Sequence, residues 1–491
     1  MHRFSHFRLR LAAMLLLALA FCGLSQACRA DDIPFDRNVF VAYQKTVVTG
    51  SNAGHATLEA SGPANHAGFS VVVNSATASL QCYISSDKAL TYTVNGGSPV
   101  TITGDNTWAV RPLSGITSGC TLEVTWDPGN YLWFDANATL VLGTGGTISR
   151  PAGWGEMIYP SDSLTAVRLA QGITNNGNSW LFRWPDQIAG IRGRATSIRV
   201  YALDGDSAGN LRALSDRAPH GSSVPINVQS NVPHWYTLGG GMDITGEHDL
   251  GVGCGFAGNY TTVYAVCLVG GYSSTSPPTA YAGVAACIGD SISAGNAIAA
   301  NGLGDSFDSW FYKFCAARNL DPINRAIGGS FVISGQPNSA VDRFSTDMAG
   351  LSPAPGFVVL CHGANDIHNE VGQSAFVAGY TTLIGDFRSA YPSSKIYQFG
   401  TVDRADDGSA HVATRAAYNS AVDAIATSAG ADGHWLTDGV IIPGSDCIDG
   451  LHPTPAGATK IANYMLAKIF PPLPARRLIT SSPSGGKRVL H

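Results

Sequence analysis

The hydrophobic pattern of the chain changes near residues 271–280, and this change is the strongest constraint on the fold. Before it, residues 31–270 contain short segments in which apolar and polar residues alternate. After it, short apolar segments alternate with longer stretches that carry apolar residues at helical spacing. A period of two is typical of β-strands, and strands alternating with helices are typical of a parallel sheet covered on both faces. The sequence therefore predicts a β-rich part followed by an α/β part.

The β-rich part has the pattern of an antiparallel β-sandwich. Its alternating segments, rich in β-branched and aromatic residues, recur about every ten residues between turn residues. Clear examples are 68–73, 90–94, 121–126 and 197–202. The chain holds 57 glycines among 491 residues, well above the usual share of roughly 7%. This excess indicates many tight turns and therefore many short strands.

Two stretches of the β-rich part resemble each other and indicate an internal repeat. Trp108 is followed by the segment 113–124, and Trp235 is followed by 242–252. Each segment is a glycine-containing turn that leads into an alternating strand. The repeat predicts two β-sandwich modules, 31–150 and 151–270, although a single larger module also fits the pattern.

The α/β part is predicted to follow a linker at 271–280, which is rich in Ser, Thr and Pro. Strands are predicted over 284–288, 357–361 and 395–399, and helices over 374–389, 414–428 and 456–469. This alternation predicts a three-layer α/β/α domain over 281–475. The remaining residues, 476–491, are predicted to be a disordered tail.

The N-terminal residues 1–30 have the pattern of an export signal. Basic residues precede an unbroken apolar run of twelve residues, Leu11–Cys22, and a segment of small residues follows. Cleavage is expected after Ala27 or Ala30. Twelve residues are fewer than the roughly 20 that a membrane-spanning helix needs. We therefore expect a secreted, periplasmic or cell-surface protein without a membrane span. Cys28 is a weaker candidate for a lipid anchor, because Gln26 fits that signal poorly.

Charge argues against nucleic acid as a partner. Removal of residues 1–30 takes away four arginines and no acidic residue, which changes the formal net charge from −5 to −9. A protein with this acidic balance and no basic run is not expected to bind nucleic acid. Oligomeric state is not predicted by the sequence.

Eight cysteines follow the export signal, and export permits disulfides. Cys82 with Cys120, and Cys254 with Cys267, are plausible pairs, because each pair lies within one strand-rich region. The four cysteines of the α/β part are predicted to be buried thiols. None has the Cys-x-x-Cys spacing of a zinc site, so the sequence predicts no metal and no cofactor.

A serine follows the first predicted strand of the α/β part. The segment 284–288 runs directly into Gly-Asp-Ser-Ile-Ser-Ala-Gly, in which the serine is Ser291. Reactive groups of parallel sheets lie where strands end, so Ser291 is well placed to be a nucleophile. The same residues also make an ordinary turn, and the motif is weak when taken alone.

A serine nucleophile needs a base, and Asp449-Gly-Leu-His452 before the last predicted helix supplies one. A carboxylate can hold the Nδ1–H of the imidazole, which leaves Nε2 free to accept the serine proton. Taken alone, the pair fits equally well a turn aspartate beside a surface histidine.

The negative oxygen of an acyl-transfer intermediate needs hydrogen-bond donors already in place. Gly329, within Asn-Arg-Ala-Ile-Gly-Gly-Ser after a predicted strand, offers an unobstructed backbone N–H. Asn365, within Gly-Ala-Asn-Asp after the 357–361 strand, offers a side-chain amide. All of these motifs lie in one α/β domain, in this order.

This ordered set resembles the SGNH, or GDSL, hydrolase superfamily, whose four motif blocks carry Ser, Gly, Asn and His. The resemblance covers about 190 residues, and no motif position departs from it. It implies a flavodoxin-like fold and metal-free ester hydrolysis through an acyl-enzyme. It also implies that Ser291 attacks, His452 acts as base and then acid, and Asp449 orients it. The N–H groups of Ser291 and Gly329 and the Asn365 amide would form the oxyanion hole.

Other polar residues near the motifs receive structural interpretations. His362 is more often packed than lining a pocket, and Asp290 and Asp366 are expected to brace loops. Ser293 and Ser330 are minor candidates for contact with substrate.

The superfamily acts on lipids, thioesters, acetylated sugars and aryl esters, and the fold does not choose among them. Strand-rich modules ahead of the catalytic domain are similar to those of carbohydrate esterases that carry a β jelly-roll. Removal of acetyl groups from carbohydrate, as a small molecule or a polysaccharide, is therefore the leading hypothesis. The alternative within the enzyme class is a lipase or thioesterase for longer acyl chains.

A third reading is a glycan-binding or adhesion protein whose esterase activity is incidental. Tryptophans of the β-rich part are candidates for stacking on sugars, although core packing is their commoner role. They are Trp108, Trp126, Trp133, Trp180 and Trp235.

Overall fold

The structure is a computed structural model that describes most of the chain after the predicted export signal. The described residues are 32–34, 41–42, 55–58, 67–84, 89–126, 132–135, 139–142, 147–149, 155–158, 160, 164–171, 173–176, 179–204, 210–226, 234–255, 261–295, 305–405 and 409–471. The predicted signal at 1–30, with Cys28, and the predicted tail at 476–491 lie outside them. No helix within the described part of the chain is long and apolar enough to cross a membrane.

The chain forms two compact units, each described here by itself. Unit 1 comprises Met1–Arg183, Ile188–Cys254 and Gly258–Thr279. Unit 2 comprises Ala280–His491 together with two short segments from earlier in the chain, Trp184–Gln187 and Gly255–Ala257.

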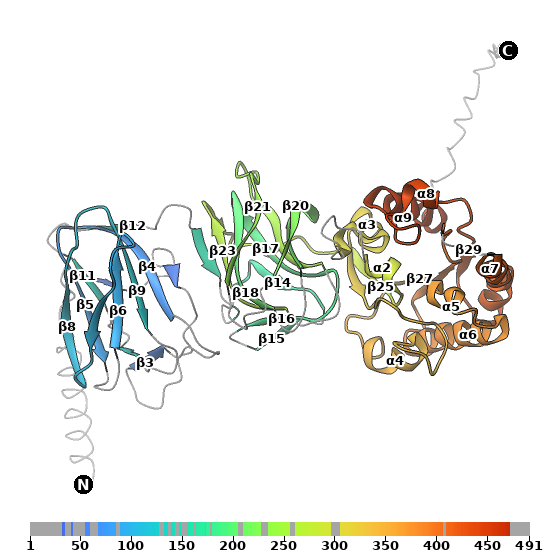
Figure 1. Cartoon of the computed structure of the whole chain (residues 1–491), viewed down its shortest axis with the longest axis horizontal. Coiled ribbons are helices and arrows are strands. Elements are labelled where there is room, and N and C mark those ends of the chain that lie inside the picture. The colour runs from blue at the N-terminus through green and yellow to red at the C-terminus, as the bar shows by residue number, and fades with distance from the viewer. Residues whose placement is uncertain are drawn as a thin grey trace, which may run out of the picture. The chain divides into compact units, whose positions relative to one another are not determined.

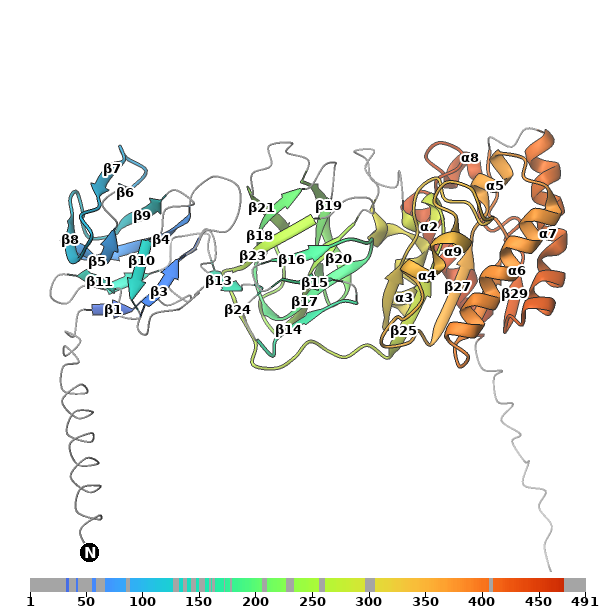
Figure 2. The ribbon, with the colours of Figure 1, turned by 90° about the horizontal axis from the view of Figure 1, so that it is seen from below.

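The described residues of unit 1 form four six-stranded antiparallel sheets (Figures 1 and 2). The first sheet contains β1 (Asp32–Pro34), β3 (His55–Leu58), β5 (Ala78–Ile84), β8 (Thr107–Leu113), β10 (Leu132–Asp135) and β11 (Thr139–Leu142). The second contains β2 (Val41–Ala42), β4 (Ala67–Asn74), β6 (Ala89–Val94), β7 (Val100–Thr103), β9 (Cys120–Trp126) and β12 (Thr147–Ser149).

The other two sheets come from residues 155–273. The third contains β13 (Gly155–Ile158), β15 (Thr174–Asn175), β16 (Trp180–Phe182), β18 (Ser197–Asp204), β21 (His234–Gly240) and β23 (Thr261–Val269). The fourth contains β14 (Val167–Leu169), β17 (Gln187–Arg194), β19 (Asn210–Ser215), β20 (Ala218–Pro225), β22 (His248–Cys254) and β24 (Tyr272–Ser273).

Alternate residues of these strands build the core, which confirms the predicted sandwich-like β-rich part. Ile198 and Val200 of β18 and Leu211 and Ala213 of β19 are fully buried in one cluster, although they belong to different sheets. Every second side chain of a strand points to the same face of its sheet. Apolar side chains on the inner faces of two packed sheets therefore share one core.

The two stretches that indicated a repeat have the same local topology. After β8 of the first sheet, the chain turns at 114–119 and enters β9 of the second sheet. After β21 of the third sheet, it turns at 241–247 and enters β22 of the fourth. In both cases the turn carries the chain from one sheet to the next.

The segment predicted as a linker, 271–280, is partly a strand. Tyr272 pairs with Arg194 as part of β24, and the backbone N–H of Thr279 donates to the Asp249 carboxylate at 3.1 Å. Outside β24 the backbone of this segment has no regular secondary structure. Composition alone does not show which hydrogen bonds distant residues make with it.

The disulfides considered from sequence are absent. All eight described cysteines are buried, and none of them forms a disulfide with another described cysteine. Cys82 lies in the first sheet and Cys120 in the second, while Cys254 lies in the fourth and Cys267 in the third. The two cysteines of each predicted pair lie in the same strand-rich region but in different sheets, and they do not form a disulfide.

One of the candidate sugar-stacking tryptophans is packed inside unit 1. Trp180 is only 1% exposed, so core packing explains it and it is not retained as a sugar-stacking residue. Trp235 is partly buried and packs against Tyr201 with ring centroids 5.2 Å apart. The side chains of Trp108, Trp126 and Trp133 lie outside what the structure describes.

Unit 2 contains a five-stranded parallel sheet with the order β26-β25-β27-β28-β29, which confirms the predicted α/β fold. Numbered along the chain this order is 2-1-3-4-5, that of flavodoxin-like folds. The strands are β25 (Gly283–Cys287), β26 (Leu320–Asn324), β27 (Phe357–Cys361), β28 (Lys395–Phe399) and β29 (Gly433–Trp435). The helices are α2 (Ser291–Ala294), the 3-10 helix η1 (Ser306–Asp308), α3 (Trp310–Ala317), α4 (Ala340–Asp347), α5 (Ala364–His368), α6 (Gln373–Ala390), α7 (Ser409–Ala429), α8 (Pro443–Asp446) and α9 (Pro455–Ile469).

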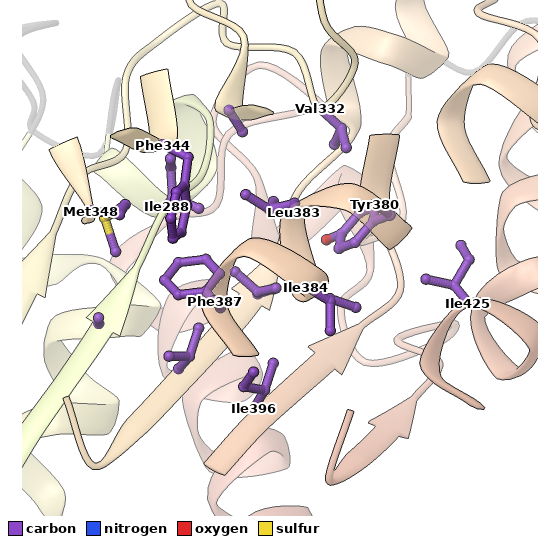
Figure 3. Packing of buried hydrophobic residues seen from close by; sticks show 14 of the residues in the cluster. Ile288, Val332, Phe344, Met348, Tyr380, Leu383, Ile384, Phe387, Ile396 and Ile425 are labelled. Carbon is purple, nitrogen blue, oxygen red and sulfur yellow. The ribbon is translucent and has the colours of Figure 1, made fainter. Parts of the chain in front are cut away.

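Side chains of the sheet alternate between two cores, one on each face. Val284, Ala286 and Ile288 belong to a cluster with residues of α4, α6 and α7. Ala285 and Cys287 belong to a second cluster with residues of α3 and α9. Figure 3 shows the first cluster, in which side chains of α4 and α6 meet those of the strands. Helices therefore cover both faces of the sheet, and its carboxyl edge is where loops project.

Candidate active site

Three of the residues singled out from sequence follow neighbouring strands of the parallel sheet. Ser291 follows β25, Gly329 follows β26, and Asn365 follows β27. In the order 2-1-3-4-5 the first and third strands are adjacent, and the crevice at their carboxyl ends is the usual ligand site. The fold therefore gathers at one edge residues that lie up to 74 positions apart.

Asp290 fixes the short helix that carries Ser291. This aspartate is the N-cap of α2, and its Oδ1 accepts from the N–H of Ile292 at 3.0 Å. Its Oδ2 accepts from the N–H of Ala364 at 3.3 Å, which joins α2 to the start of α5. Ser291 is the first residue of α2, so no carbonyl within the helix can accept its N–H. Asp290 therefore braces two loops, in agreement with the sequence interpretation.

Ser291, His452 and Asp449 form a continuous hydrogen-bonded chain. The Ser291 Oγ lies 2.9 Å from His452 Nε2, and His452 Nδ1 lies 2.6 Å from Asp449 Oδ2. These contacts bring together residues 161 positions apart, and they have the geometry that activates a serine hydroxyl. Ser291 is 8% exposed and His452 is half-buried, so the chain ends near the surface of unit 2.

The backbone around His452 holds the pair in place. Asp449 Oδ1 accepts from the N–H groups of His452 at 2.7 Å and of Leu451 at 3.0 Å. Burial alone would raise the pKa of Asp449, but its hydrogen bonds with the His452 side chain and these two N–H groups lower it to about 2. The carboxylate is therefore ionised at neutral pH, and an ionised carboxylate stabilises a proton on His452 Nδ1.

Gly329 and Asn365 offer the donors expected of an oxyanion hole. Gly329 has a φ of 74°, and nothing lies within 4 Å of the Cβ that another residue would add there. Glycine adopts this left-handed conformation without strain and leaves its N–H open to approach. The Asn365 amide donates one N–H to the Ser330 carbonyl at 2.9 Å, which fixes its orientation and leaves its second N–H available.

Gly363 allows the turn between β27 and α5. Its φ is 125°, and a Cβ there would lie 2.8 Å from the Phe376 ring and 3.0 Å from Thr401. Any other residue would strain the backbone and displace these neighbours. The glycine therefore sets the position from which Asn365 projects.

The remaining polar residues near the motifs are structural. The His362 Nε2–H donates to the Ser330 carbonyl at 3.0 Å, and Asp366 accepts from the N–H of Val332 at 3.0 Å. His362 and Asp366 are buried, in agreement with their structural interpretation. The interpretation of Ser293 and Ser330 as substrate contacts is wrong. Both are fully buried, and their hydroxyls donate to backbone carbonyls.

Arg343 is a supporting residue that sequence reasoning missed. Its guanidinium Nη2 donates to the Gly289 carbonyl at 3.2 Å, and Nη1 donates to the Arg325 carbonyl at 2.5 Å. It also pairs with Asp347 at 3.0 Å. The first two contacts join the loop before Ser291 to the loop before Gly329. Its sequence context is an ordinary amphipathic helix, which offers no signal of this role.

No cluster of three or more His, Cys, Asp or Glu side chains within the described ranges has the arrangement of a metal site.

Comparison with known proteins identifies the fold and the family of this part of the chain. Residues 287–460 match the model of the GDSL-like lipase/acylhydrolase family, while no curated protein matches the chain. Among solved structures, the chain is similar to an active-site mutant of a family two carbohydrate esterase from Clostridium thermocellum. The identity is 17% and the TM-score 0.53, and the match covers 62% of this chain and 97% of that one.

Two further structures show the same relationship. A family two carbohydrate esterase from Cellvibrio japonicus matches at 16% identity and a TM-score of 0.51, over 64% of this chain and 97% of that one. An acetyl xylan esterase from the rumen bacterium Butyrivibrio proteoclasticus matches at 11% identity and a TM-score of 0.50, over 64% and 98%. These matches cover more of the chain than residues 287–460, so the shared fold includes some of the preceding residues. Residues 287–460 thus contain a GDSL-like lipase/acylhydrolase domain, which supports assignment of the chain as a hydrolase of ester bonds.

Proposed function

We propose that the chain is an exported serine esterase that removes acetyl groups from carbohydrate, with Ser291, His452 and Asp449 as its catalytic triad. The observation that carries this proposal is the hydrogen-bonded chain of 2.9 Å from Ser291 Oγ to His452 Nε2 and 2.6 Å from His452 Nδ1 to Asp449 Oδ2. The export signal predicted over residues 1–30 makes an extracellular or periplasmic substrate part of the proposal.

In the first half of the reaction, the Ser291 Oγ attacks the ester carbonyl carbon while His452 Nε2 takes the serine proton. The carbonyl oxygen becomes negative and accepts hydrogen bonds from the N–H groups of Ser291 and Gly329 and from the free N–H of Asn365. The ester C–O bond then breaks, and the leaving alcohol takes the proton from His452. The acetyl group remains bound to Ser291 Oγ as an ester.

In the second half, water enters and loses a proton to His452 as it attacks the acyl carbon. The same donors stabilise the second negative intermediate. The bond to the Ser291 Oγ breaks, His452 returns its proton to that oxygen, and acetic acid is released. Asp449 stays ionised throughout and keeps the imidazole in the Nδ1–H form.

The carbohydrate substrate is supported by the structures to which the chain is similar. The structures to which the chain is similar include carbohydrate esterases and an acetyl xylan esterase, at 11–17% identity. Such similarity is evidence for fold, and chemistry on one fold differs widely. The shared part nevertheless includes residues outside the catalytic family match, which favours a carbohydrate ester over other esters.

The oxyanion-hole assignment predicts a large effect on turnover alone. We expect Asn365→Ala to lower kcat about 10²- to 10³-fold with little change in KM, because the lost N–H acts on charge that develops in the transition state. Steady-state kinetics with p-nitrophenyl acetate measure this. Asn369→Ala is the matched control, since Asn369 lies one turn further along and donates to the Asn365 carbonyl. Equal loss in both variants, or an effect on KM only, contradicts the assignment.

Acyl-chain preference tests the substrate class. For an acetyl esterase we expect kcat/KM on the p-nitrophenyl acetate ester to exceed that on the octanoate and palmitate esters by about tenfold or more, because a site shaped for a small acyl group excludes extra methylenes. Acetate release from acetylated xylan should accompany this preference. If active enzyme releases no acetate from acetylated xylan, pectin or small acetylated sugars, the carbohydrate proposal is wrong.

A second candidate, hydrolysis of longer acyl esters, is favoured by one observation. Ile442 is 64% exposed and Ile448 is 51% exposed, and Ile448 directly precedes Asp449. Exposed aliphatic side chains at such a loop would suit an apolar substrate. Highest activity on the octanoate or palmitate ester would select this candidate.

A further inference from the structure

We infer that Asp186 is a positioning residue for the active site, acting through Asn324 on the helix that carries Ser291 and on the loop that leads to Gly329. The inference rests on the proposed function, because it takes Ser291 and Gly329 as the groups that are positioned. In sequence Asp186 lies between strands β16 and β17 of the β-rich part, but it belongs to unit 2.

The side chain of Asn324 joins three segments. Its Nδ2 donates to Asp186 Oδ2 at 2.8 Å and to the Ser293 carbonyl at 3.0 Å. Its Oδ1 accepts from the N–H of Ala326 at 3.0 Å. Ser293 is two residues after Ser291, and Ala326 is three residues before Gly329. One amide therefore connects the nucleophile helix with the candidate oxyanion loop.

Asp186 is one of three groups that fix which way this amide faces. An ionised carboxylate only accepts hydrogen bonds, so it faces the Nδ2 of Asn324 and not its oxygen. The Ser293 carbonyl also accepts from Nδ2, and the N–H of Ala326 donates to Oδ1. Asp186 thus adds a third contact to the orientation that these two backbone groups favour.

A second connection runs from Asp186 to the C-terminal end of α2. The Asp186 N–H donates to Ser306 Oγ at 3.0 Å, and the neighbouring Asp305 N–H donates to the carbonyl of Gly295 at 3.0 Å. Gly295 is the C-cap of α2. The segment that contains Asp186 is therefore connected, through Asn324 and through residues 305–306, to the C-terminal half of the four-residue helix that presents Ser291.

The setting is rigid enough for such an effect. Asp186 and Asn324 are fully buried, and the Arg325 guanidinium lies 4.8 Å from the centre of the Trp184 ring. The Arg325 N–H donates to the Cys287 carbonyl at 2.8 Å, directly before the Ser291 loop. Buried groups held by several hydrogen bonds transmit small displacements, and a displacement near 1 Å lowers turnover substantially.

Two variants of nearly equal shape separate hydrogen bonding from packing. Asp186→Asn keeps an oxygen that accepts from Asn324 and has nearly the same shape. Burial raises the pKa of Asp186 to about 7, although hydrogen bonds with Ser306 and Asn324 act to lower it. An uncharged amide is therefore a mild replacement for this side chain. Asp186→Leu has a similar shape and makes none of these hydrogen bonds.

We expect Asp186→Leu to lower kcat on p-nitrophenyl acetate about 10- to 100-fold with KM nearly unchanged. Asp186→Asn should retain kcat within about threefold. If Asp186 acts through Asn324, the double variant Asp186→Leu/Asn324→Ala should lose no more activity than Asn324→Ala alone. All measurements use the full chain.

Glu156→Met is the matched control, because Glu156 is a buried carboxylate of the β-rich part that hydrogen-bonds with Ser273 and belongs to unit 1. Thermal unfolding is measured for every variant. A Tm lowered in both Glu156→Met and Asp186→Leu, with kcat lowered only in the latter, supports the positioning role. A wild-type kcat in Asp186→Leu, a change confined to KM, or fully additive losses in the double variant would overturn it.

Failure of this inference is distinguishable from failure of the proposed function. If Ser291→Ala is inactive and Asp186→Leu retains the wild-type kcat, only the positioning role is wrong. If Ser291→Ala retains activity, the catalytic assignment itself is wrong.

Discussion

Ser291→Ala should lower kcat/KM on p-nitrophenyl acetate by a factor of about 10⁴ to 10⁶ while leaving the fold intact. The Ser291 Oγ is the atom that would form the bond to substrate, and no neighbouring hydroxyl can replace it. Ser293 is fully buried and donates to the Cys361 carbonyl. The residual rate should reflect the oxyanion donors and binding alone.

The control for this variant is Ser428→Ala in α7, whose hydroxyl donates to the Ile425 carbonyl one helical turn earlier. It removes the same atom from unit 2, and we expect wild-type kinetics. Tm values of both variants should lie close to that of the wild type, because Ser291 Oγ hydrogen-bonds with the partly exposed side chain of His452. Activity that persists in folded Ser291→Ala would place the nucleophile elsewhere.

Asp449→Asn should lower kcat by about 10² to 10⁴ with KM little changed. The asparagine oxygen would keep accepting from the N–H groups of Leu451 and His452, which now bind Asp449 Oδ1. Its NH₂ group would then face His452 Nδ1, at the position that Asp449 Oδ2 occupies. This favours a histidine with its proton on Nε2, and that form cannot accept the proton of Ser291.

A second aspartate–histidine pair of unit 2 provides the control. Asp423 Oδ1 lies 2.8 Å from His434 Nε2 on an exposed surface, and Asp423→Asn should leave kcat unchanged. The two variants remove one negative charge each, so a general effect of charge would appear in both. Equal kinetics for the two variants would remove Asp449 from the triad.

Much of the α/β part follows from local pattern. The predicted strands at 357–361 and 395–399 coincide with β27 and β28, and the three predicted helices coincide with α6, α7 and α9 to within a few residues. These elements are strongly periodic and lie against the core, so burial and propensity agree. Strand β26 is harder to delimit because Pro322 stands in its middle, and β29 has only three residues, too few for a clear period.

The proposed catalytic residues could be found from sequence because each belongs to a short motif beside a predicted element. Their meeting at one edge is a property of the parallel sheet, whose strand ends converge. Arg343 and Asp186 have no such motif. Asp186 meets Asn324 across 138 positions, and only the folded chain shows that partnership. The predicted disulfide pairs were wrong for a related reason. The position of a cysteine in the sequence does not show which sheet its strand joins.

The discontinuity of unit 2 bears on how such a protein can be divided or recombined. A boundary drawn at residue 280, where the composition suggests one, would keep every member of the proposed triad. It would also leave the Asn324 amide without the Asp186 carboxylate and the Ser306 hydroxyl without the Asp186 N–H. Exchange of the β-rich part between related esterases would then preserve the catalytic motifs and still alter the enzyme. The part of the chain that the proposed active site needs is therefore longer than the stretch that carries its motifs.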